Sequence, residues 1–415
     1  YTTAESSAAS DVYKRQRLLR PPPLSIGRSH CSRRRGCSTI LSSSPRSTNS
    51  ASGSPPASLP YPDAVRQPDP LPTIEEIGRT LAPAGIRHVG VTTADVLDEA
   101  RAALHDRAAH GLHGDMGFTY RNPDRSTDPR RAVPGARSVI VAARSYLTES
   151  DPPAPTDGPH ARVGRYAWVD HYAPLRSALR DVARRLRRCD HRAVAFADDN
   201  SIVDRAVAHR AGLGWYGKNA NLLLPGVGSW YVLGCIVTTA AYEPAAALVD
   251  DGCGSCRRCI DECPTGAIVA PGVIDANRCL SWVLQKPGSV PAEYREAIGD
   301  RIYGCDDCQD ACPISVRLGR RDTIELDPAA QAWVDAIALL DADDDSIEQR
   351  HGHWYIAGRD MRWLRRNALI VVGNVGDPAD GRVRRVVDHY RAGIDPILAE
   401  HAAWAAARLD RRSHA

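Results

Sequence analysis

The sequence lacks any long apolar run. None of its hydrophobic stretches approaches the roughly 20 residues that an α-helix needs to cross a bilayer, so we predict a protein without a membrane partner. Its 415 residues are 43% hydrophobic and 25% charged, which is ordinary usage for a globular protein. A chain of this length is expected to contain two or three domains.

A strong net charge is also missing. Lysine and arginine total 53 against 50 aspartates and glutamates, which gives a formal charge of +3. The first 60 residues carry a local charge of +7, so the remaining 355 carry −4. Whole-chain charge therefore gives no support for nucleic-acid binding, and any such surface must be a local patch. Only three lysines occur, a bias toward arginine that says little about function.

The first 60 residues contain fifteen serines and almost no acid. This composition is typical of disorder, and we predict that residues 1–70 are a disordered or non-native leader, with a native start near 60–75. An Arg- and Ser-rich leader is also typical of a transit peptide, and Arg33, Arg34 and Arg35 resemble half of a twin-arginine signal. No long apolar segment follows these arginines, which argues against that signal.

From residue 72 the sequence alternates between helical and extended patterns. We predict helices at 74–81 and 175–188, and strands at 87–91 and 137–142. Such alternation predicts an α/β domain, which we assign to residues 71–248.

The second half of the chain has two further parts. Residues 249–320 are rich in cysteine and short turns, which indicates a small ferredoxin-like domain folded around metal clusters. Residues 321–415 are predicted to be helical at 363–372, 383–391 and 397–409, and these helical hairpins resemble HEAT repeats. The predicted fold class is thus a mixture of α/β and α+β with a helical C-terminal region.

Eight of the twelve cysteines lie in metal-type spacing. The first four form C-x2-C-x2-C-x3-C-P, the run found in bacterial ferredoxins. A C-x2-C-x3-C-P run follows, with one more cysteine between the two runs. The eight residues are Cys253, Cys256, Cys259, Cys263, Cys279, Cys305, Cys308 and Cys312.

Eight thiolates suffice for two [4Fe–4S] clusters. In two-cluster ferredoxins the fourth cysteine of the run ligates the other cluster. This rule assigns one cluster to Cys253, Cys256, Cys259 and Cys312, and the second to Cys263, Cys279, Cys305 and Cys308. A pair of structural zinc sites is the alternative, because zinc also uses C-x2-C pairs. Four consecutive cysteines followed by proline favour iron–sulfur.

Thiolate ligands indicate a reducing compartment, so we predict a cytoplasmic location. Cys189 and Cys235 lack metal-type spacing, and we expect both to be buried thiols. Nothing in a ferredoxin-like domain consumes electrons. The catalytic centre is therefore expected in the α/β domain.

A glycine motif, G-x-G-x-x-G, occurs at Gly212, Gly214 and Gly217. The dinucleotide fingerprint needs a preceding strand, whereas residues 201–211 predict a helix with Ser201 as its N-cap and Gly212 just past its end. Nucleotide binding is therefore not predicted here. The glycines are expected to let the backbone pass close to something flat and bulky.

A polar turn with Asp198 and Asp199 precedes that predicted helix. The simpler interpretation is that an aspartate caps the helix. The functional interpretation is a proton donor at a strand-to-helix corner, which requires burial to raise the pKa of the carboxyl. Composition and spacing leave both interpretations open.

Taken together, the two cysteine runs and residues 198–205 and 212–219 resemble the epoxyqueuosine reductase family. These bacterial enzymes of tRNA modification use cobalamin and iron–sulfur clusters. The resemblance runs from about residue 72 to the C-terminal helices. Supporting stretches are residues 90–94, 165–172, 228–234 and 301–306.

The resemblance implies reduction of epoxyqueuosine to queuosine at the tRNA wobble position, the last step of queuosine biosynthesis. Electrons would pass from an external flavodoxin- or ferredoxin-type donor through two [4Fe–4S] clusters to cobalamin. The family motif D-[TS]-x-x-x-x-[DE]-R places the proton donor at Asp198, with Asp204 and Arg205 at its later positions. Asp199 stands where the family usually has Thr or Ser. We expect a monomer.

The same matching implies further binding residues. Arg125, Gly164, Asp198, Leu222 and Leu233 fall where the family contacts cobalamin, and Arg205 where it contacts tRNA. Other candidates for a tRNA surface are basic or aromatic side chains on the cluster domain and beyond. They are Arg257, Arg258, Arg317, Arg320, Arg321, Arg359, Arg362, Arg365, Arg366, Trp354 and Tyr355.

Two alternatives share part of this pattern. A reductive dehalogenase also combines cobalamin with two clusters, but usually has a twin-arginine leader and a catalytic tyrosine. A non-catalytic ferredoxin-type electron-transfer protein would leave the α/β domain and the C-terminal helices without a task.

Overall fold

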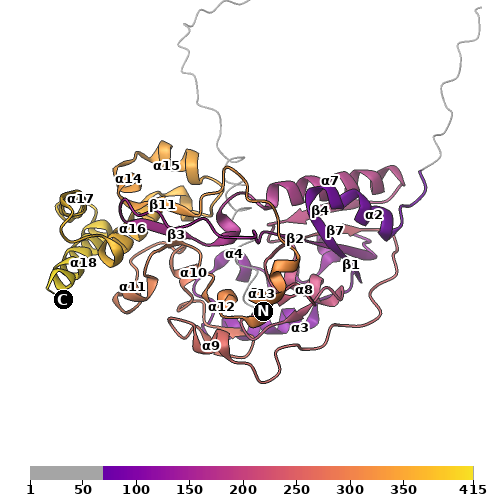
Figure 1. The fold of residues 1–415 in the computed structure, drawn as a ribbon. Coiled ribbons are helices and arrows are strands. Elements are labelled where there is room, and N and C mark those ends of the chain that lie inside the picture. Colours follow the sequence, from indigo (N-terminus) through magenta and orange to yellow (C-terminus); the bar gives the residue numbers. More distant parts are fainter. Residues whose placement is uncertain (1–68, 415) are drawn as a thin grey trace, which may run out of the picture.

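The computed structural model describes residues 69–414. The predicted leader therefore lies almost wholly outside the described residues. A sheet with its covering helices forms one end of the molecule, the C-terminal helices form the other, and the cysteine-rich segment lies between them (Figure 1). No helix within the described range combines the length and apolar character needed to cross a membrane.

The central sheet has four strands in the order β1-β2-β7-β4. Their bounds are Ile86–Thr93 (β1), Ser138–Ser145 (β2), Tyr231–Thr238 (β7) and Ala193–Ala197 (β4). The predicted strands at 87–91 and 137–142 are confirmed. Every pairing is antiparallel, however, so the domain has an α+β sheet and lacks the parallel sheet that α/β alternation favours.

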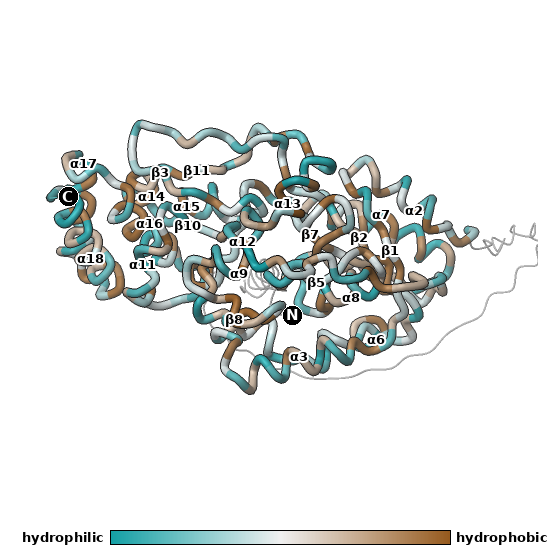
Figure 2. The backbone as a smooth tube through the Cα atoms, turned by 60° about the horizontal axis from the view of Figure 1, so that its bottom comes forward, coloured by the Kyte–Doolittle hydropathy of each residue, from teal (hydrophilic) through white to brown (hydrophobic). Residues whose placement is uncertain are grey.

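Helices cover both faces of this sheet. On one face lie α2 (Ile74–Leu81) and α7 (Tyr172–Arg188), both predicted from sequence, and on the other lie α3 (Asp98–Ala109) and α8 (Asp204–Arg210). The side chains of β2 alternate between the two cores, because successive residues of a strand point to opposite faces. Val139 and Val141 enter one core, and Ile140 enters the other. Figure 2 shows the hydrophobic character of these strands.

The helix predicted at 201–211 begins later than expected. Helix α8 starts at Asp204, and its N-cap is Val203, which makes no side-chain capping bond. Ser201 does not cap the helix, because it lies two residues before the N-cap. Its backbone N–H donates to the Asp199 carboxylate at 2.8 Å. Gly212 follows the helix end with φ +69°, as predicted for the residue after a C-cap.

A second sheet joins distant parts of the chain. Strand β3 (His160–Val163) lies between β10 (Arg301–Tyr303) and β11 (Trp333–Asp335). It pairs in parallel with β10 and antiparallel with β11. The segments predicted as three domains thus meet in one sheet.

Short elements complete the first half of the chain. They are η1 (Ala82–Ala84), α4 (Gly117–Tyr120), α5 (Pro123–Ser126), α6 (Pro129–Ala132), η2 (Arg165–Ala167), β5 (Trp215–Tyr216) and β6 (Leu222–Leu223). The cysteine-rich segment adds α9 (Arg258–Asp261), β8 (Ile268–Ala270), β9 (Val273–Ile274), α10 (Leu280–Val283), α11 (Ala292–Ile298), α12 (Asp307–Asp310), α13 (Pro313–Leu318) and η3 (Gly319–Arg321).

The C-terminal region is helical. It comprises α14 (Ala336–Asp341), α15 (Asp344–His351), η4 (Ala357–Arg359), α16 (Arg362–Val375), α17 (Gly381–Arg391) and α18 (Pro396–Ser413). The last three confirm the predicted helices. Asp380 and Asp395 cap α17 and α18 with their carboxylates. The resemblance to HEAT repeats stays a prediction.

A buried arginine ties this region to the cysteine-rich segment. Arg366 on α16 is fully buried, so the prediction that it belongs to a tRNA surface is wrong. Its guanidinium donates to the carbonyl oxygens of Val283, Leu284, Lys286 and Gly288. Burial lowers its pKa to about 9, and the four carbonyls hold the cation without a direct carboxylate partner among the described residues.

We predict that Arg366→Met destabilises the protein strongly. The carbonyls of Val283, Lys286 and Gly288 lose their Arg366 donor, whereas that of Leu284 keeps its bond from Asn367. Each unsatisfied group costs about 1–3 kcal/mol, so the free energy of unfolding should fall by about 3 kcal/mol or more. The measurement is urea unfolding of the iron-loaded protein. Arg362→Met, which removes an exposed arginine of the same helix, is the control and should change the midpoint little. Equal effects of the two variants would show that the hydrogen bonds from Arg366 to these carbonyls do not stabilise the protein.

Candidate active site

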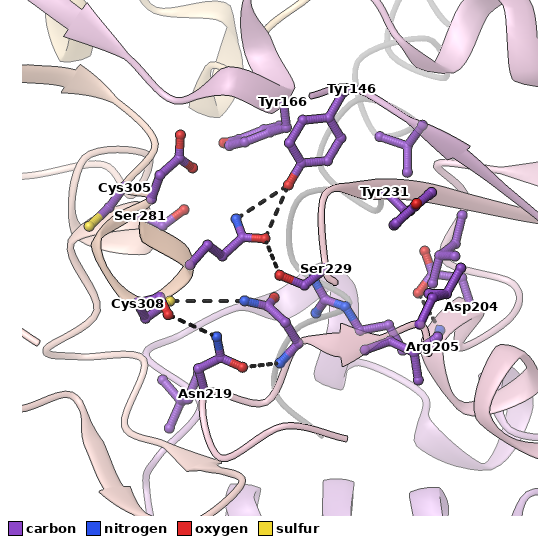
Figure 3. Close-up of a pocket in the computed structure, with 18 of the residues that line it drawn as sticks. Tyr146, Tyr166, Asp204, Arg205, Asn219, Ser229, Tyr231, Ser281, Cys305 and Cys308 are labelled. Atoms are coloured by element: carbon purple, nitrogen blue, oxygen red, sulfur yellow. Dashed lines mark hydrogen bonds between the residues drawn. The ribbon is translucent and has the colours of Figure 1, made fainter. Parts of the chain in front are cut away.

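A cavity lies between the central sheet, the β5–β6 segment and the cysteine-rich segment (Figure 3). Its cavity volume is about 110 Å³, and part of it opens to solvent. The residues that line it come from many parts of the chain. They include Tyr146, Tyr166, Asp204, Arg205, Asn219, Asn221, Leu222, Ser229, Tyr231, Leu233, Cys279, Ser281, Cys305, Asp306, Cys308 and Gln309.

The glycine motif shapes one wall of this cavity. A Cβ on Gly214 would lie well inside contact distance of the Leu223 backbone, and one on Gly217 would meet the Leu223 side chain. The predicted close approach is therefore present, but its partner is strand β6 of the same chain and not a flat ligand. Because β5 and β6 approach so closely, Leu222 is held in the cavity wall.

Hydrogen bonds order the opposite wall. The Tyr146 hydroxyl lies 3.3 Å from Gln309 Oε1, and the Ser229 hydroxyl donates to the same oxygen at 2.9 Å (Figure 3). Burial is the main reason why the pKa of Tyr146 is raised, so this phenol stays protonated. Sequence analysis did not single out Tyr146 or Gln309. The only signals were that Ser229 lies in a stretch resembling the family and that Gln309 follows Cys308.

The thiols of the cysteine-rich segment lie close to one another, and their division into two cluster sets stays a prediction. Burial and the neighbouring thiols of Cys312, Cys253 and Cys256 raise the pKa of Cys259 to about 11. Burial and the thiols of Cys305, Cys279 and Cys259 raise the pKa of Cys308 well above its usual value.

Cys263 packs with thiols of both predicted sets. It lies with Cys259, Cys279 and Cys308 around one small hydrophobic cluster, and its sulfur accepts the Ala267 N–H at 3.2 Å. Within residues 69–414, no three or more His, Cys, Asp or Glu side chains converge on a position for a single metal ion.

Asp198 lies directly after β4, at the strand-to-helix corner. It is buried, with 3% exposure, and its φ of +59° is in the left-handed region that few non-glycine residues adopt. Burial raises the pKa of Tyr303, and the Asp198 carboxylate raises it further. Because α8 lacks a side-chain cap, the capping interpretation of Asp198 does not hold.

Comparisons with known proteins agree with this geometry. Residues 252–315 match the 4Fe-4S double cluster binding domain, and residues 126–199 match the family described as Epoxyqueuosine reductase QueG, DUF1730. An epoxyqueuosine reductase from Lactococcus garvieae is 32% identical, over 81% of this chain and 96% of that protein. One from Xanthomonas campestris is 35% identical, over 83% and 98%. The chain belongs to the epoxyqueuosine reductase family.

Solved structures of the family have the same fold. A crystal structure of epoxyqueuosine reductase with an epoxyqueuosine-modified tRNA-Tyr stem loop has a TM-score of 0.74 and 29% identity, covering 81% of this chain and 90% of that one. The enzyme from Streptococcus thermophilus has a TM-score of 0.73 at the same identity and coverage.

Some of the residues that the family resemblance implies for cobalamin binding line the cavity, and others do not. Leu222 and Leu233 line the cavity. Gly164 lies beside it, where a Cβ would be 3.2 Å from Gly304 Cα and 3.5 Å from Asp306 Oδ1. Arg125 is exposed on α5, and neither Arg125 nor Asp198 is among the residues that line the cavity.

Arg205, the residue implied for tRNA contact in the reductase family, lies in the cavity wall with Asp204 (Figure 3). Both belong to the first turn of α8. The Nη1 atom of Arg205 is buried and has no hydrogen-bond partner within the described chain. The positions match the family motif residue by residue.

Several predicted tRNA-surface residues are unsuited to that role. Trp354 is buried at 1% exposure and stacks on Tyr303 with ring centroids 4.6 Å apart, so it is not available to bases. Tyr355 packs against Phe118 and Trp282. Three arginines of the helical region are engaged in ion pairs. These pairs are Arg359–Glu348, Arg362–Asp360 and Arg365–Asp344.

The remaining candidates are exposed. Arg257 pairs with Asp261 at 3.6 Å, whereas Arg258, Arg317, Arg320 and Arg321 form no ion pair with another described residue. Cys189 and Cys235 are buried, as predicted.

We predict that Gly214→Ala disrupts the cavity wall. The added methyl would meet the Leu223 backbone, which cannot rotate away as a side chain can, so unfolding free energy should fall by about 1–3 kcal/mol. The measurement is thermal unfolding of the iron-loaded reductase. Gly78→Ala on α2 is the matched control, because its Cβ meets nothing within 4 Å, and an alanine there should slightly stabilise the helix. A neutral Gly214→Ala would show that the hairpin is not closely packed.

Proposed function

We propose that this enzyme reduces epoxyqueuosine to queuosine at the wobble position of tRNA, using cobalamin and two [4Fe–4S] clusters. The single observation that carries the proposal is the cavity, in a chain of this family. Thiols of one predicted cluster form one wall, and the Asp204–Arg205 turn of α8 forms another. An electron source and a substrate-binding side chain thus face the same space.

The lining of the cavity suits the proposed cobalamin. Leu222 and Leu233 offer apolar contact, and Tyr231 and Val232 extend the wall. Gly164 packs closely against Gly304 beside the cavity. When bound, cobalamin would supply a strongly reduced metal centre able to attack or reduce an electrophile. The exposed Arg125 is not part of this proposal.

The reaction fixes what the protein must supply. Removing the epoxide oxygen as water consumes two electrons and two protons and leaves a carbon–carbon double bond. We propose Asp198 as the donor of the proton to the departing oxygen. Its buried position after β4 keeps bulk water away from the carboxyl, and the left-handed backbone at Asp198 directs the chain into the turn that leads to Arg205.

Arg205 is proposed to contact the tRNA substrate. Its guanidinium is the cationic group in the cavity wall contributed by α8, and one of its nitrogens is buried without a partner. A phosphate or base edge of the bound nucleotide would satisfy this donor. Arg205 thereby places the substrate on the same side of the cavity as the turn that carries Asp198.

The alternatives are less well supported. A non-catalytic electron-transfer protein does not need a cavity lined by both thiols and an arginine. A reductive dehalogenase is not favoured either, because the chain matches nearly the whole length of curated epoxyqueuosine reductases. The proposed location remains the cytoplasm, where thiolate ligands are kept reduced.

We predict that Asp198→Asn lowers the rate of epoxyqueuosine reduction by about 10²–10⁴-fold, because the amide cannot donate an acidic proton. The measurement is mass spectrometry of nucleosides after incubating the reconstituted enzyme, a strong reductant and epoxyqueuosine-containing tRNA. Asp199→Asn is the matched control and should retain most activity. If the Asp199 variant were the inactive one, the neighbouring carboxyl would be the acid.

Double cysteine variants test the crossed cluster assignment. Cys259→Ser combined with Cys312→Ser should remove one cluster and leave about four irons per chain, because both ligate the same cluster. Cys259→Ser combined with Cys263→Ser should damage both clusters. Iron analysis and electron paramagnetic resonance of the reduced proteins measure the outcome. The reverse pattern would mean that each run holds its own cluster.

A further inference from the structure

A second, smaller cavity adjoins the active-site cavity. Its volume is about 30 Å³, which leaves room for about two water molecules, since one needs about 10–15 Å³. Tyr166 and Tyr172 line both cavities and therefore form the partition between them. The other residues that line the small cavity are Ala167, Val169, Asp170, Tyr303, His353, Trp354 and Tyr355.

The small cavity lies near Asp198. Tyr172 belongs to the same hydrophobic core as Ala197, the residue directly before Asp198. Tyr303, on another wall, is also affected by this aspartate, because burial and then the Asp198 carboxylate raise the pKa of its phenol. The Asp198 carboxyl therefore lies close to the residues that separate the two cavities.

Hydroxyl groups give the small cavity polar walls. The Tyr166 hydroxyl accepts a hydrogen bond from Gln285 Nε2 at 3.1 Å, and the Tyr303 hydroxyl accepts the backbone N–H of Tyr355 at 2.9 Å. Each phenol keeps its own O–H for a further partner. Burial raises the pKa of both phenols, so they stay protonated. A small space with several hydroxyl groups is suited to hold ordered water.

One side of the small cavity reaches the protein surface, where Asp170 is exposed and His353 is half-buried. The Nε2 atom of His353 lies 2.9 Å from the carbonyl oxygen of Ala167. Because a carbonyl only accepts hydrogen bonds, Nε2 carries a proton, and Nδ1 is the nitrogen that can bind and release another. The Asp170 carboxylate is engaged differently, since it accepts the backbone N–H groups of Tyr172 and Ala173.

A buried acid must regain its proton after each reaction. Asp198 is only 3% exposed, and in the proposed function it gives its proton to the departing epoxide oxygen. Substrate in the active-site cavity hinders the entry of protons from that side. The small cavity approaches the same acid from the other side of Tyr166 and Tyr172.

We propose that the small cavity is the route by which Asp198 regains its proton, and that His353 brings protons to this route from solvent. The inference rests on the proposed function. In each cycle Asp198 loses one proton to the departing oxygen and regains one through water from the His353 imidazolium, which takes a replacement from solvent. No electron moves in these steps. Histidine is the side chain most often used as a proton shuttle near neutral pH.

The competing interpretation of His353 is structural. Its bond to Ala167 would then only hold the segment 353–355 against the chain before α7. A glutamine at position 353 separates the two roles, because its amide N–H can still donate to the Ala167 carbonyl but cannot carry a proton. The His353 side chain lines only the small cavity of the two, so we assign it a positioning role that acts through Asp198.

The test is multiple-turnover reduction of epoxyqueuosine-containing tRNA by the holoenzyme with excess reductant, followed by mass spectrometry of nucleosides. We expect His353→Gln to lower kcat about tenfold or more, with the KM for tRNA unchanged. His353→Ala should be equally slow. Added imidazole should restore most of the rate of the alanine variant, which leaves space for it, and should not change the rate of the parent enzyme.

The control is His389→Ala, which removes an exposed histidine from α17 and should leave kcat within about twofold of the parent. Iron content and the midpoint of thermal unfolding check that every variant is folded and loaded. Parent-like turnover by His353→Gln would overturn the proposal, because the bond to Ala167 would then suffice. Failure of imidazole to restore His353→Ala would overturn it as well. Absence of reduction by the parent enzyme would instead contradict the proposed function.

Discussion

The attachment of the β5–β6 hairpin to the cysteine-rich segment is the interaction on which the site depends. Lys218 donates to the carbonyl oxygens of Gly254 and Cys256, and Asn219 donates to that of Cys308 at 3.1 Å. One short hairpin thereby positions both thiol sets against the sheet that forms the cavity. Each bond uses a main-chain acceptor, so it fixes the path of the chain without consuming the sulfur atoms that clusters require. Hydrogen bonds from a charged donor such as the Lys218 ammonium are stronger than those between two neutral groups.

Sequence patterns predicted those parts of the site in which chemistry fixes the spacing. The cysteine runs predicted a segment that holds two clusters, which the family match over residues 252–315 confirms. The aspartate turn left two interpretations open, and the one that required a buried carboxyl at the end of β4 agrees with the burial of Asp198. Sequence patterns failed where packing between distant parts of the chain determines strand direction or the burial of a side chain. Alternation of helices and strands does not specify strand direction, so the antiparallel sheet was not predicted. Trp354 and Arg366 looked like surface residues because nothing local reveals that β10 and the loop after α10 bury them.

The polar wall of the cavity was not predicted, because its residues come from separate parts of the sequence. Tyr146 ends one strand of the central sheet, Ser229 precedes another, and Gln309 lies between two cysteines, so no local motif unites them. Their hydrogen bonds exist only after the cysteine-rich segment has docked on the sheet. In contrast, the G-x-G-x-x-G motif was visible in the sequence but served a different purpose, since the absence of side chains allows two strands of one hairpin to touch.

The sheet formed by β10, β3 and β11 also has a consequence for biosynthesis. All strands of the central sheet have been translated by Thr238, so that sheet can form early on the ribosome. Strand β3, in contrast, waits for Tyr303 and then Asp335 before both of its edges are paired. All eight predicted cluster ligands emerge before that last strand. This sheet is thus completed only by residues that follow the predicted cluster ligands in the chain.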